Sequence, residues 1–291
     1  DHNLALLKKA GADVHFYRPI NILRPHHSNR RTHRKILITD GHTAFTGGSG
    51  FAHAWSGNAQ NHFHWRDTHF RLRGPAVAGM QRAFALNWQE LTDVELSGPA
   101  YYPPLRPVGR DLVQNALAGH DFPQANLANS YLAAINAARQ RLFLQQAYFI
   151  PGPEIRAALL RAARRGVEID LIVPGPLIDS KPSRHASQNH WRELLSAGIR
   201  LHQYEGTMMH AKILVADEHL SLIGSANIDP RSFYLNDENN LHVISPRFAR
   251  EQIRILRADL PRCREITLEN LPHQLAPAPQ RWLARLIEWQ L

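Results

Sequence analysis

The chain has 291 residues, 44% of them hydrophobic, which is enough to bury a core in one large domain or two medium ones. Its 34 Lys and Arg residues outnumber its 25 Asp and Glu residues, and the net charge is +9 with the histidines neutral. This composition excludes a disordered chain and favours anionic partners: phosphate esters, nucleic acid or an acidic lipid surface. Cys263 is the only cysteine, which excludes an intrachain disulfide and a cysteine-based metal site, and no apolar run reaches the ~18 residues of a membrane span.

The N-terminal part of the chain is expected to open with an amphipathic helix that stops at Gly11 and leads into a short strand over residues 12–18. A later strand over 67–73 precedes a helix that begins near Pro75. Residues 97–110 are rich in proline and glycine and show no periodicity, which is typical of a linker.

Strands and helices alternate in the C-terminal part. The pattern predicts helices over 125–140 and 152–166 and strands over 142–150 and 167–175. A further helix stops at Gly198 and leads into another short strand. This alternation predicts a mainly parallel or mixed sheet with helices on both faces.

The two parts read as copies of one unit. When the helix starts at Pro75 and Pro246 are aligned, Asp67 pairs with Glu238, because each carboxylate lies eight residues before its proline. We therefore predict an α/β fold of two pseudo-symmetric sandwich halves, with an active site at the interface between them. The expected halves are residues 1–108, which end in the linker, and residues 109–291, which end in an amphipathic helix.

The first copy begins abruptly and not with methionine. Nothing ahead of Asp1 matches the leading strands and helices of the second copy, so the first half is expected to lack roughly its leading third. Without partners for its own sheet, that half is expected to be the less stable one, and this chain alone to be largely inactive.

Each copy carries a histidine two residues before a lysine. Side chains alternate along a strand, so His33 and Lys35 share one face, as do His210 and Lys212. Such a pair suits a phosphodiester, because the lysine offsets charge on the non-bridging oxygens while the imidazole attacks phosphorus or moves a proton near neutral pH. A single pair of this kind is most often an exposed polar pair, but two copies in aligned repeats indicate catalysis.

The matched spacing continues beyond the lysines. Asp40 and Asp217 follow at the turn that ends each strand and are expected to be structural anchors. The turns "TGGSG" and "IGSAN" come next, and their backbone N–H groups and Ser or Asn donors suit phosphate oxygens. The first turn has Gly50 where the second has Asn227, which removes one amide donor, and backbone N–H groups of residues 47–50 are expected to compensate.

These residues resemble the phospholipase D superfamily, whose signature is His-x-Lys-x4-Asp-x6-Gly-Ser-x-Asn in duplicate. Within it, the chain is most similar to bacterial cardiolipin synthases, and "WRDTHFRLRGPAV" and "GSANIDPRSFYLNDENNLHV" also carry that similarity. The resemblance implies one active site between the halves and chemistry without a metal or cofactor. It also implies that His33 forms a phosphohistidine while His210 protonates the departing alcohol, although the near-symmetric motifs leave the reverse assignment open.

The resemblance assigns roles to the remaining site residues. The lysines and Asn227 are expected to hold phosphoryl oxygens, with Ser225 assisting, and the two carboxylates to orient the histidines. The catalytic set is His33, Lys35, His210, Lys212, Asn227, Asp67 and Glu238; the substrate-binding set is Ser225, Gly48 and Ser49; the structural pair is Asp40 and Asp217.

The leading hypothesis for function is phosphatidyl transfer between two phosphatidylglycerol molecules, giving cardiolipin and glycerol. With water as acceptor, the same residues would make a phospholipase D or a nuclease, and a degenerate member would be an anion-binding scaffold. The expected partners are anionic phospholipid and a membrane surface, with no nucleic acid. The expected location is peripheral, on the cytoplasmic side of the bacterial cytoplasmic membrane.

Three other segments raise alternatives. His62 and His64 alternate in a way that can hold a metal, but no acidic cluster accompanies them. The basic run Arg24–Arg34 leads into the first motif and is expected at the mouth of the site. The C-terminal helix, with Trp282, Leu286 and Trp289 on one side, is expected to dock on the domain, with binding to a membrane interface as the alternative.

Overall fold

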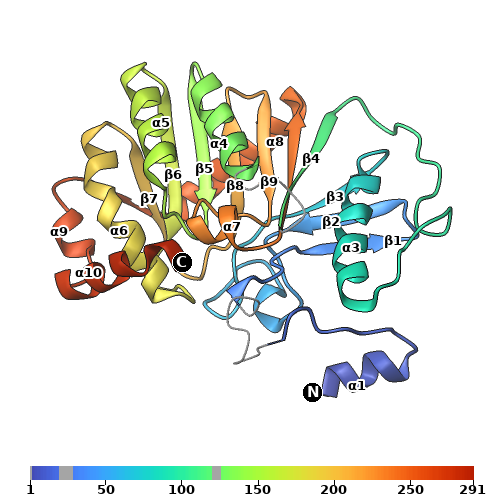
Figure 1. Cartoon of the computed structure of the whole chain (residues 1–291). Coiled ribbons are helices and arrows are strands. Elements are labelled where there is room, and N and C mark those ends of the chain that lie inside the picture. Colours follow the sequence, from blue (N-terminus) through green and yellow to red (C-terminus); the bar gives the residue numbers. More distant parts are fainter. Residues whose placement is uncertain (1, 20–28, 120–125) are drawn as a thin grey trace.

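The computed structural model describes residues 2–19, 29–119 and 126–291 and contains a small and a large β-sheet (Figure 1). The small sheet has the order β1-β2-β3, is antiparallel, and belongs to the N-terminal part. The elements of that part are α1 (His2–Lys9), β1 (Ile36–Thr39), β2 (Thr43–Gly47), the short 3-10 helix η1 (His53–Trp55), β3 (His69–Arg73) and α3 (Val77–Thr92).

The large sheet has eight strands in the order β11-β7-β6-β5-β8-β9-β10-β4. Strands β5, β6 and β7 are mutually parallel, and the other neighbours are antiparallel. The elements of the C-terminal part are β4 (Leu112–Ala118), α4 (Asn126–Ala137), β5 (Arg141–Gln146), α5 (Pro153–Arg164), β6 (Glu168–Pro174), α6 (Lys181–Ser196), β7 (Arg200–Tyr204), β8 (Lys212–Ala216), β9 (Leu220–Gly224), α7 (Pro230–Tyr234), β10 (Glu238–Ile244), α8 (Pro246–Asp259), η2 (Leu260–Arg262), β11 (Cys263–Ile266), α9 (Leu271–Gln274), α10 (Ala278–Leu286) and η3 (Glu288–Gln290).

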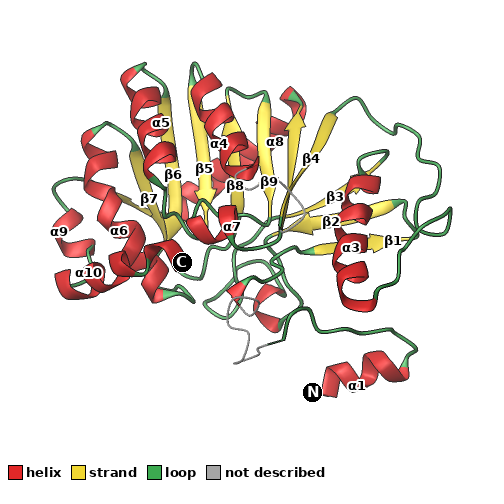
Figure 2. Cartoon of the chain, viewed as in Figure 1, coloured by secondary structure: helices red, strands yellow, loops and turns green. Residues whose placement is uncertain are grey.

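Helices cover both faces of the large sheet (Figure 2). Strand β8 is buried at every residue because it lies in the middle of this sandwich, and its sequence KILVA is accordingly almost continuously apolar. Leu214 packs toward α4, α5 and α6, whereas its neighbours Ile213 and Val215 pack toward α8. Because side chains alternate along the strand, β8 contributes residues to two separate hydrophobic cores, one on each face of the sheet.

One of these cores joins the two parts of the chain. Ala44 of β2, Leu72 of β3 and Met80 of α3 are buried in the same cluster as Ile213 and Ile223 of the large sheet. The small sheet and α3 therefore pack on the same face of the large sheet as α8. This packing brings the first residues of β1 and β8 into one region of the molecule, and the histidines of the two motifs lie just before these strands.

The α/β architecture confirms the expected fold class, and the helices and strands expected between residues 125 and 175 form with small differences in their ends. The linker segment 97–110 contains neither helix nor strand, as its proline and glycine content indicates. The prediction of a short strand over residues 12–18 is wrong: these residues follow α1 without forming a strand, and they bend at residues 17 and 18. Its counterpart β7 pairs with β6, and within the described N-terminal residues no strand takes the place of β6.

Candidate active site

Two short stretches of backbone pair across the two parts of the chain and fix the histidines. The N–H of His33 donates to the carbonyl of Asp237 at 2.9 Å, and the N–H of Asp237 donates to Arg31 at 2.9 Å. In the other motif, the N–H of His210 donates to the carbonyl of Arg66 at 2.7 Å. Each histidine is therefore bonded through its own backbone to the residue that precedes a carboxylate of the opposite part.

Those carboxylates bind the histidine side chains. The Nδ1 atom of His33 lies 2.9 and 3.1 Å from the two carboxylate oxygens of Glu238. The Nδ1 atom of His210 lies 3.0 Å from Oδ2 of Asp67. Both pairs thus cross between the repeats, and in each the carboxylate contacts the Nδ1 atom of the imidazole and not the Nε2 atom.

Each lysine lies beside the histidine of its own motif. Lys212 Nζ donates to the carbonyl of His210 at 2.6 Å and lies 3.2 Å from its Nε2 atom. Lys35 Nζ donates to the carbonyl of His33 at 2.9 Å. The two motifs also interact electrostatically. The charge of Asp67 raises the pKa of Lys35, and the charge of Lys35 lowers the pKa of Lys212.

Burial sets the protonation of this cluster. It lowers the pKa of Lys212 to about 7 and also lowers the pKa of Lys35. Burial and the charge of Lys212 lower the pKa of His210, and the Asp67 carboxylate only partly opposes them. The imidazole of His210 is therefore held uncharged. Its Nδ1–H group donates a hydrogen bond to Asp67, and its Nε2 atom carries the lone pair.

Both carboxylates stay ionised despite their burial. Burial raises the pKa of Glu238, but the charge and hydrogen bond of His33 and the charge of Lys35 outweigh it, and the net pKa is lowered. The balance at Asp67 is the same, with the hydrogen bond to His210 as the largest opposing contribution. Each carboxylate can therefore stabilise a positive charge that forms on its histidine.

Two expected site residues, Ser225 and Asn227, lie in the "IGSAN" turn and have different surroundings. Ser225 is fully buried: its hydroxyl donates a hydrogen bond to Oε2 of Glu238, the carboxylate that orients His33, and accepts one from the backbone N–H of Asn239 at 3.0 Å. Asn227 is 3% exposed, and its side-chain oxygen has no hydrogen-bond partner among the described residues. That oxygen only accepts hydrogen bonds, so the group of Asn227 that can bind a phosphoryl oxygen is its side-chain NH2 group.

The "TGGSG" turn packs tightly against the other motif. A Cβ atom on Gly48 would lie 2.4 Å from Oδ1 of Asp67 and 2.6 Å from the carbonyl oxygen of His210, so only glycine fits there. Ser49 is half-buried beside it. A Cβ atom on Gly50 would lie 3.2 Å from the Trp55 ring, so an indole occupies the space next to the position where the second motif has Asn227.

The two motif aspartates lie at turns with left-handed backbone, with φ of 52° at Asp40 and 49° at Asp217. The carboxylate of Asp217 accepts hydrogen bonds from the backbone N–H groups of Arg139, Gln140 and Arg141 at 2.7 to 2.8 Å. These bonds tie the end of β8 to the start of β5, which is the placement expected of a structural anchor.

Three aromatic residues around His210 were missed by the sequence analysis. Trp55 and Trp65 approach its ring edge-on or tilted, with centroids 5.5 and 5.4 Å away, and Tyr148 lies at 6.3 Å. Trp55 also donates its indole N–H to Oδ2 of Asp67 at 2.9 Å. The only signal in the sequence was their position next to the motifs, in "HAWSG", "HWRDTH" and "QQAYFI".

The remaining expectations fall outside this cluster. Residues 24–28 of the basic run lie outside the described residues, while Arg34 donates to the carbonyls of Ala83 and Ala118 at 2.8 and 2.9 Å and so acts within the fold. His64 bonds to the carbonyl of Ser56 through Nδ1, and His62 stacks on Phe63. Over residues 2–19, 29–119 and 126–291, no three His, Cys, Asp or Glu side chains group in a way suited to a metal ion.

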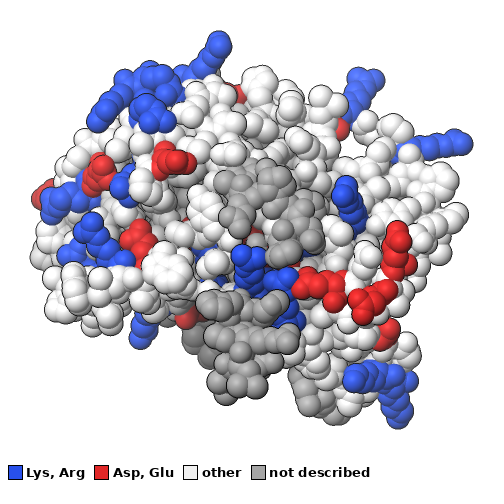
Figure 3. Space-filling model, in the orientation of Figure 1, with Lys and Arg blue, Asp and Glu red and all other residues white. Residues whose placement is uncertain are grey.

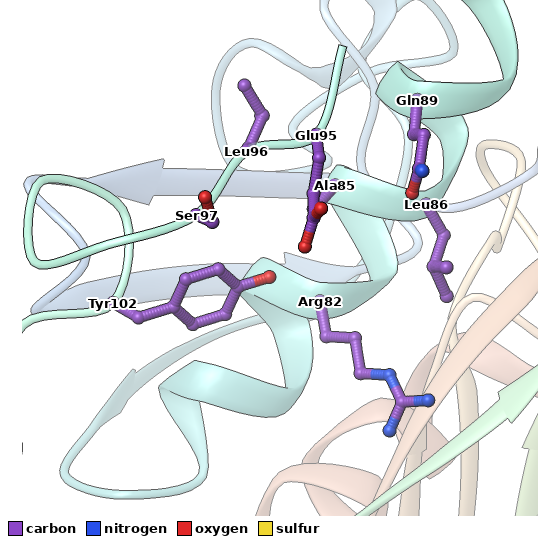
Figure 4. A pocket seen from close by; sticks show the side chains of 8 residues that line it. All are labelled: Arg82, Ala85, Leu86, Gln89, Glu95, Leu96, Ser97 and Tyr102. Carbon is purple, nitrogen blue, oxygen red and sulfur yellow. The ribbon is translucent and has the colours of Figure 1, made fainter. Parts of the chain in front are cut away.

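A separate cavity of about 350 Å³ lies between α3 and the segment that follows it, and its lining includes Arg82, Gln89, Glu95 and Tyr102 (Figure 4). In Figure 4 the Glu95 carboxylate and the Tyr102 hydroxyl point toward each other. None of the motif residues lines this cavity, so the paired histidines remain the candidate site.

Known proteins are similar to this chain in sequence. The family described as "Cardiolipin synthase, PLD-like domain" matches residues 131–260. Minor cardiolipin synthase ClsB of Bacillus subtilis (strain 168) is 32% identical over 294 residues, which cover 99% of this chain and 71% of that protein. The chain belongs to the phospholipase D superfamily. Within that superfamily it is cardiolipin synthase-like.

Two further similar proteins show how much of this chain, and how much of each similar protein, is covered. A cardiolipin synthase of Clostridium perfringens (strain 13 / Type A) is 33% identical over 277 residues, and the chain spans only 57% of that protein's length. The crystal structure of phosphatidylserine synthase from Haemophilus influenzae Rd KW20 superposes with a TM-score of 0.66 at 13% identity, covering 89% of this chain and 71% of that one. That likeness shows that the superfamily fold extends over both parts of the chain.

Proposed function

We propose that the protein transfers a phosphatidyl group from one phosphatidylglycerol to another and thereby forms cardiolipin and glycerol. The observation that carries this proposal is the pair of histidines, each held by a carboxylate of the opposite half and flanked by a lysine that is buried in one motif and partly buried in the other. The sequence likeness to cardiolipin synthases supports the choice of lipid.

In the first step, Nε2 of His33 attacks the phosphorus of the donor lipid. The phosphorus–oxygen bond to the glycerol headgroup breaks, and His210 gives a proton to the departing oxygen. His210 must be protonated for this, although its pKa is lowered in the free protein. A bound phosphodiester anion next to the ring favours the protonated form and offsets that shift.

In the second step, a terminal hydroxyl of the second lipid loses its proton to His210. Its oxygen attacks the phosphorus and releases His33, so every bond broken is replaced and no oxidant or further reactant is needed. Lys35, Lys212 and Asn227 hold the phosphoryl oxygens through both steps. Since the lysines supply the positive charge at phosphorus, we expect EDTA to leave the rate unchanged.

The alternative with water as acceptor would give phosphatidic acid. The aromatic residues Trp55, Trp65 and Tyr148 favour a lipid acceptor, because they place apolar surface beside the imidazole of His210, which takes the acceptor's proton.

The test is to incubate the protein with phosphatidylglycerol carrying a labelled glycerol headgroup and to separate the lipid products. We expect labelled cardiolipin and free glycerol in equal amounts, with less of both from residues 1–291 alone than from a version extended at the N-terminus. Phosphatidic acid as the main lipid product would instead assign the protein as a hydrolase. The double variant His33→Ala/His210→Ala is the control for activity from contaminants.

A further inference from the structure

An exposed apolar face lies on α10 and η3. Trp282, Leu286 and Trp289 are 63%, 53% and 64% exposed, while Ala284 on the other side of the helix is 3% exposed and packs with Ala186 of α6. The C-terminal helix therefore docks as expected, but the apolar stripe named in the sequence does not form the docking contact. The helix is held in place, and its largest apolar side chains face solvent.

This face is tied to both catalytic motifs. Asn29, four residues before His33, donates to the side-chain oxygen of Gln290 at 2.9 Å. Arg231, four residues after Asn227, donates to the backbone carbonyl of Gln290 at 3.0 Å. The segment that carries the exposed tryptophans thus contacts the chain on either side of the active site.

Other exposed apolar side chains come from loops that shape the site. Phe51 directly follows the "TGGSG" turn and is 95% exposed, and Phe63 lies in the loop that carries Trp55 and Trp65. Leu177 lies two residues before Asp179, which accepts a hydrogen bond from Tyr148. In Figure 1, α10 and the light-blue loop after β2 both lie on the lower side of the molecule. We name the apolar rim by these residues: Phe51, Phe63, Leu177, Trp282, Leu286 and Trp289.

The charges next to the rim suit an anionic partner. Helix α10 carries Arg281 and Arg285 and no acidic residue, and the one acid between residues 278 and 291, Glu288, is paired with His190 at 2.8 Å. Figure 3 shows a group of Lys and Arg side chains in the middle of the view, with acidic groups beside it on the right and others, mixed with basic ones, on the left. Tryptophan and leucine flanked by arginine are typical of a surface that lies in a lipid interface.

We propose that the apolar rim is the surface by which the protein lies on an anionic lipid membrane, with Trp282, Leu286 and Trp289 inserted among the headgroups. The active site then opens toward the lipid phosphates. This inference rests on the proposed function only in that the substrate is taken to be a membrane lipid. No helix in the described part of the chain is both long and apolar enough to span a bilayer, and the rim provides contact without one.

Flotation of the chain with vesicles tests the proposal. We expect the parent protein to bind vesicles that contain phosphatidylglycerol, and the double variant Trp282→Ser/Trp289→Ser to bind about tenfold more weakly because it inserts less apolar area. The control is Ile244→Ser, which removes an equally exposed apolar side chain at the end of β10 remote from Glu238. Its binding should equal that of the parent.

The readouts separate this inference from the proposed function. Turnover of short-chain phosphatidylglycerol below its micellar concentration should be the same in the double variant and the parent, because the catalytic residues are untouched. Absence of all turnover, also in a version extended at the N-terminus, would count against the proposed function, while flotation would still test the membrane-binding surface. If the double variant is destabilised, Leu286→Asp on the same face must reproduce the loss of binding.

Two results would overturn the proposal. One is flotation of the double variant and of Leu286→Asp with the same efficiency as the parent. The other is loss of self-association in these variants with vesicle binding unchanged, which would assign the face to a second copy of the chain.

Discussion

His210 and Asp67 are 143 residues apart in sequence, and their side chains meet at 3.0 Å. His33 and Glu238 repeat the arrangement in the opposite direction, over 205 residues. Each half therefore supplies the carboxylate that orients the other half's imidazole. Neither half contains a complete histidine–carboxylate pair, so the candidate site forms only when the two parts of the chain pack together.

We expect Asp67→Asn and Glu238→Gln to reduce turnover by roughly 10²- to 10⁴-fold, because an amide no longer fixes the imidazole tautomer or stabilises its positive charge. Measured kcat values for the single variants and for His210→Ala/Asp67→Asn will show whether each pair acts as a unit. The combined variant should be little worse than His210→Ala alone. Additive losses would mean that Asp67 acts elsewhere.

Gly48→Ala is expected to reduce activity strongly, because its methyl group would lie 2.4 Å from the Asp67 carboxylate and displace it from His210. The matched control is Gly109→Ala, at a glycine with no atom within 4 Å of an added Cβ. Comparison of kcat and of the thermal unfolding midpoint separates a local from a global effect. Equal activity of the two variants would show that the carboxylate tolerates the shift.

Trp55→Phe keeps an aromatic ring beside His210 but removes the indole N–H that donates to Asp67. We expect a loss of kcat of about tenfold, consistent with one hydrogen bond to a charged group, and little change in KM. A pure packing role would leave kcat unchanged in this variant and would show its effect only in Trp55→Ala.

The pH dependence of stability is expected to report on Lys212. Burial lowers its pKa to about 7, below its ordinary value of 10.5, so between these values the unfolded chain holds the extra proton. Stability then rises with pH across that window, and Lys212→Met removes this contribution. Urea unfolding at about pH 7 and about pH 9 should show the parent gaining stability relative to the variant. Identical slopes would mean that the lysine titrates normally.

The sequence predicted those parts of the site that depend on local spacing. The histidines and lysines share a motif, and the carboxylates appeared at matched positions once the repeats were aligned on Pro75 and Pro246. Which carboxylate serves which histidine could not be predicted, because the answer depends on how two packed sheets face each other.

Features set by tertiary neighbours were also missed. Trp55 and Tyr148 are ordinary aromatic residues in sequence, and only the fold brings them to His210. The strand expected over residues 12–18 has suitable residues but no described neighbour to pair with. At the C-terminus, Ala284 rather than the large apolar residues makes the docking contact, since the close approach of α10 to α6 favours a small side chain.

Detection of the covalent intermediate tests the central claim most directly. Lipid carrying a labelled phosphate is mixed with the protein, the reaction is quenched in alkali, and the labelled residue is mapped by mass spectrometry. A label on His33 of the parent, absent from His33→Ala, is the predicted result. A protein that turns over the lipid without any labelled histidine would contradict the account.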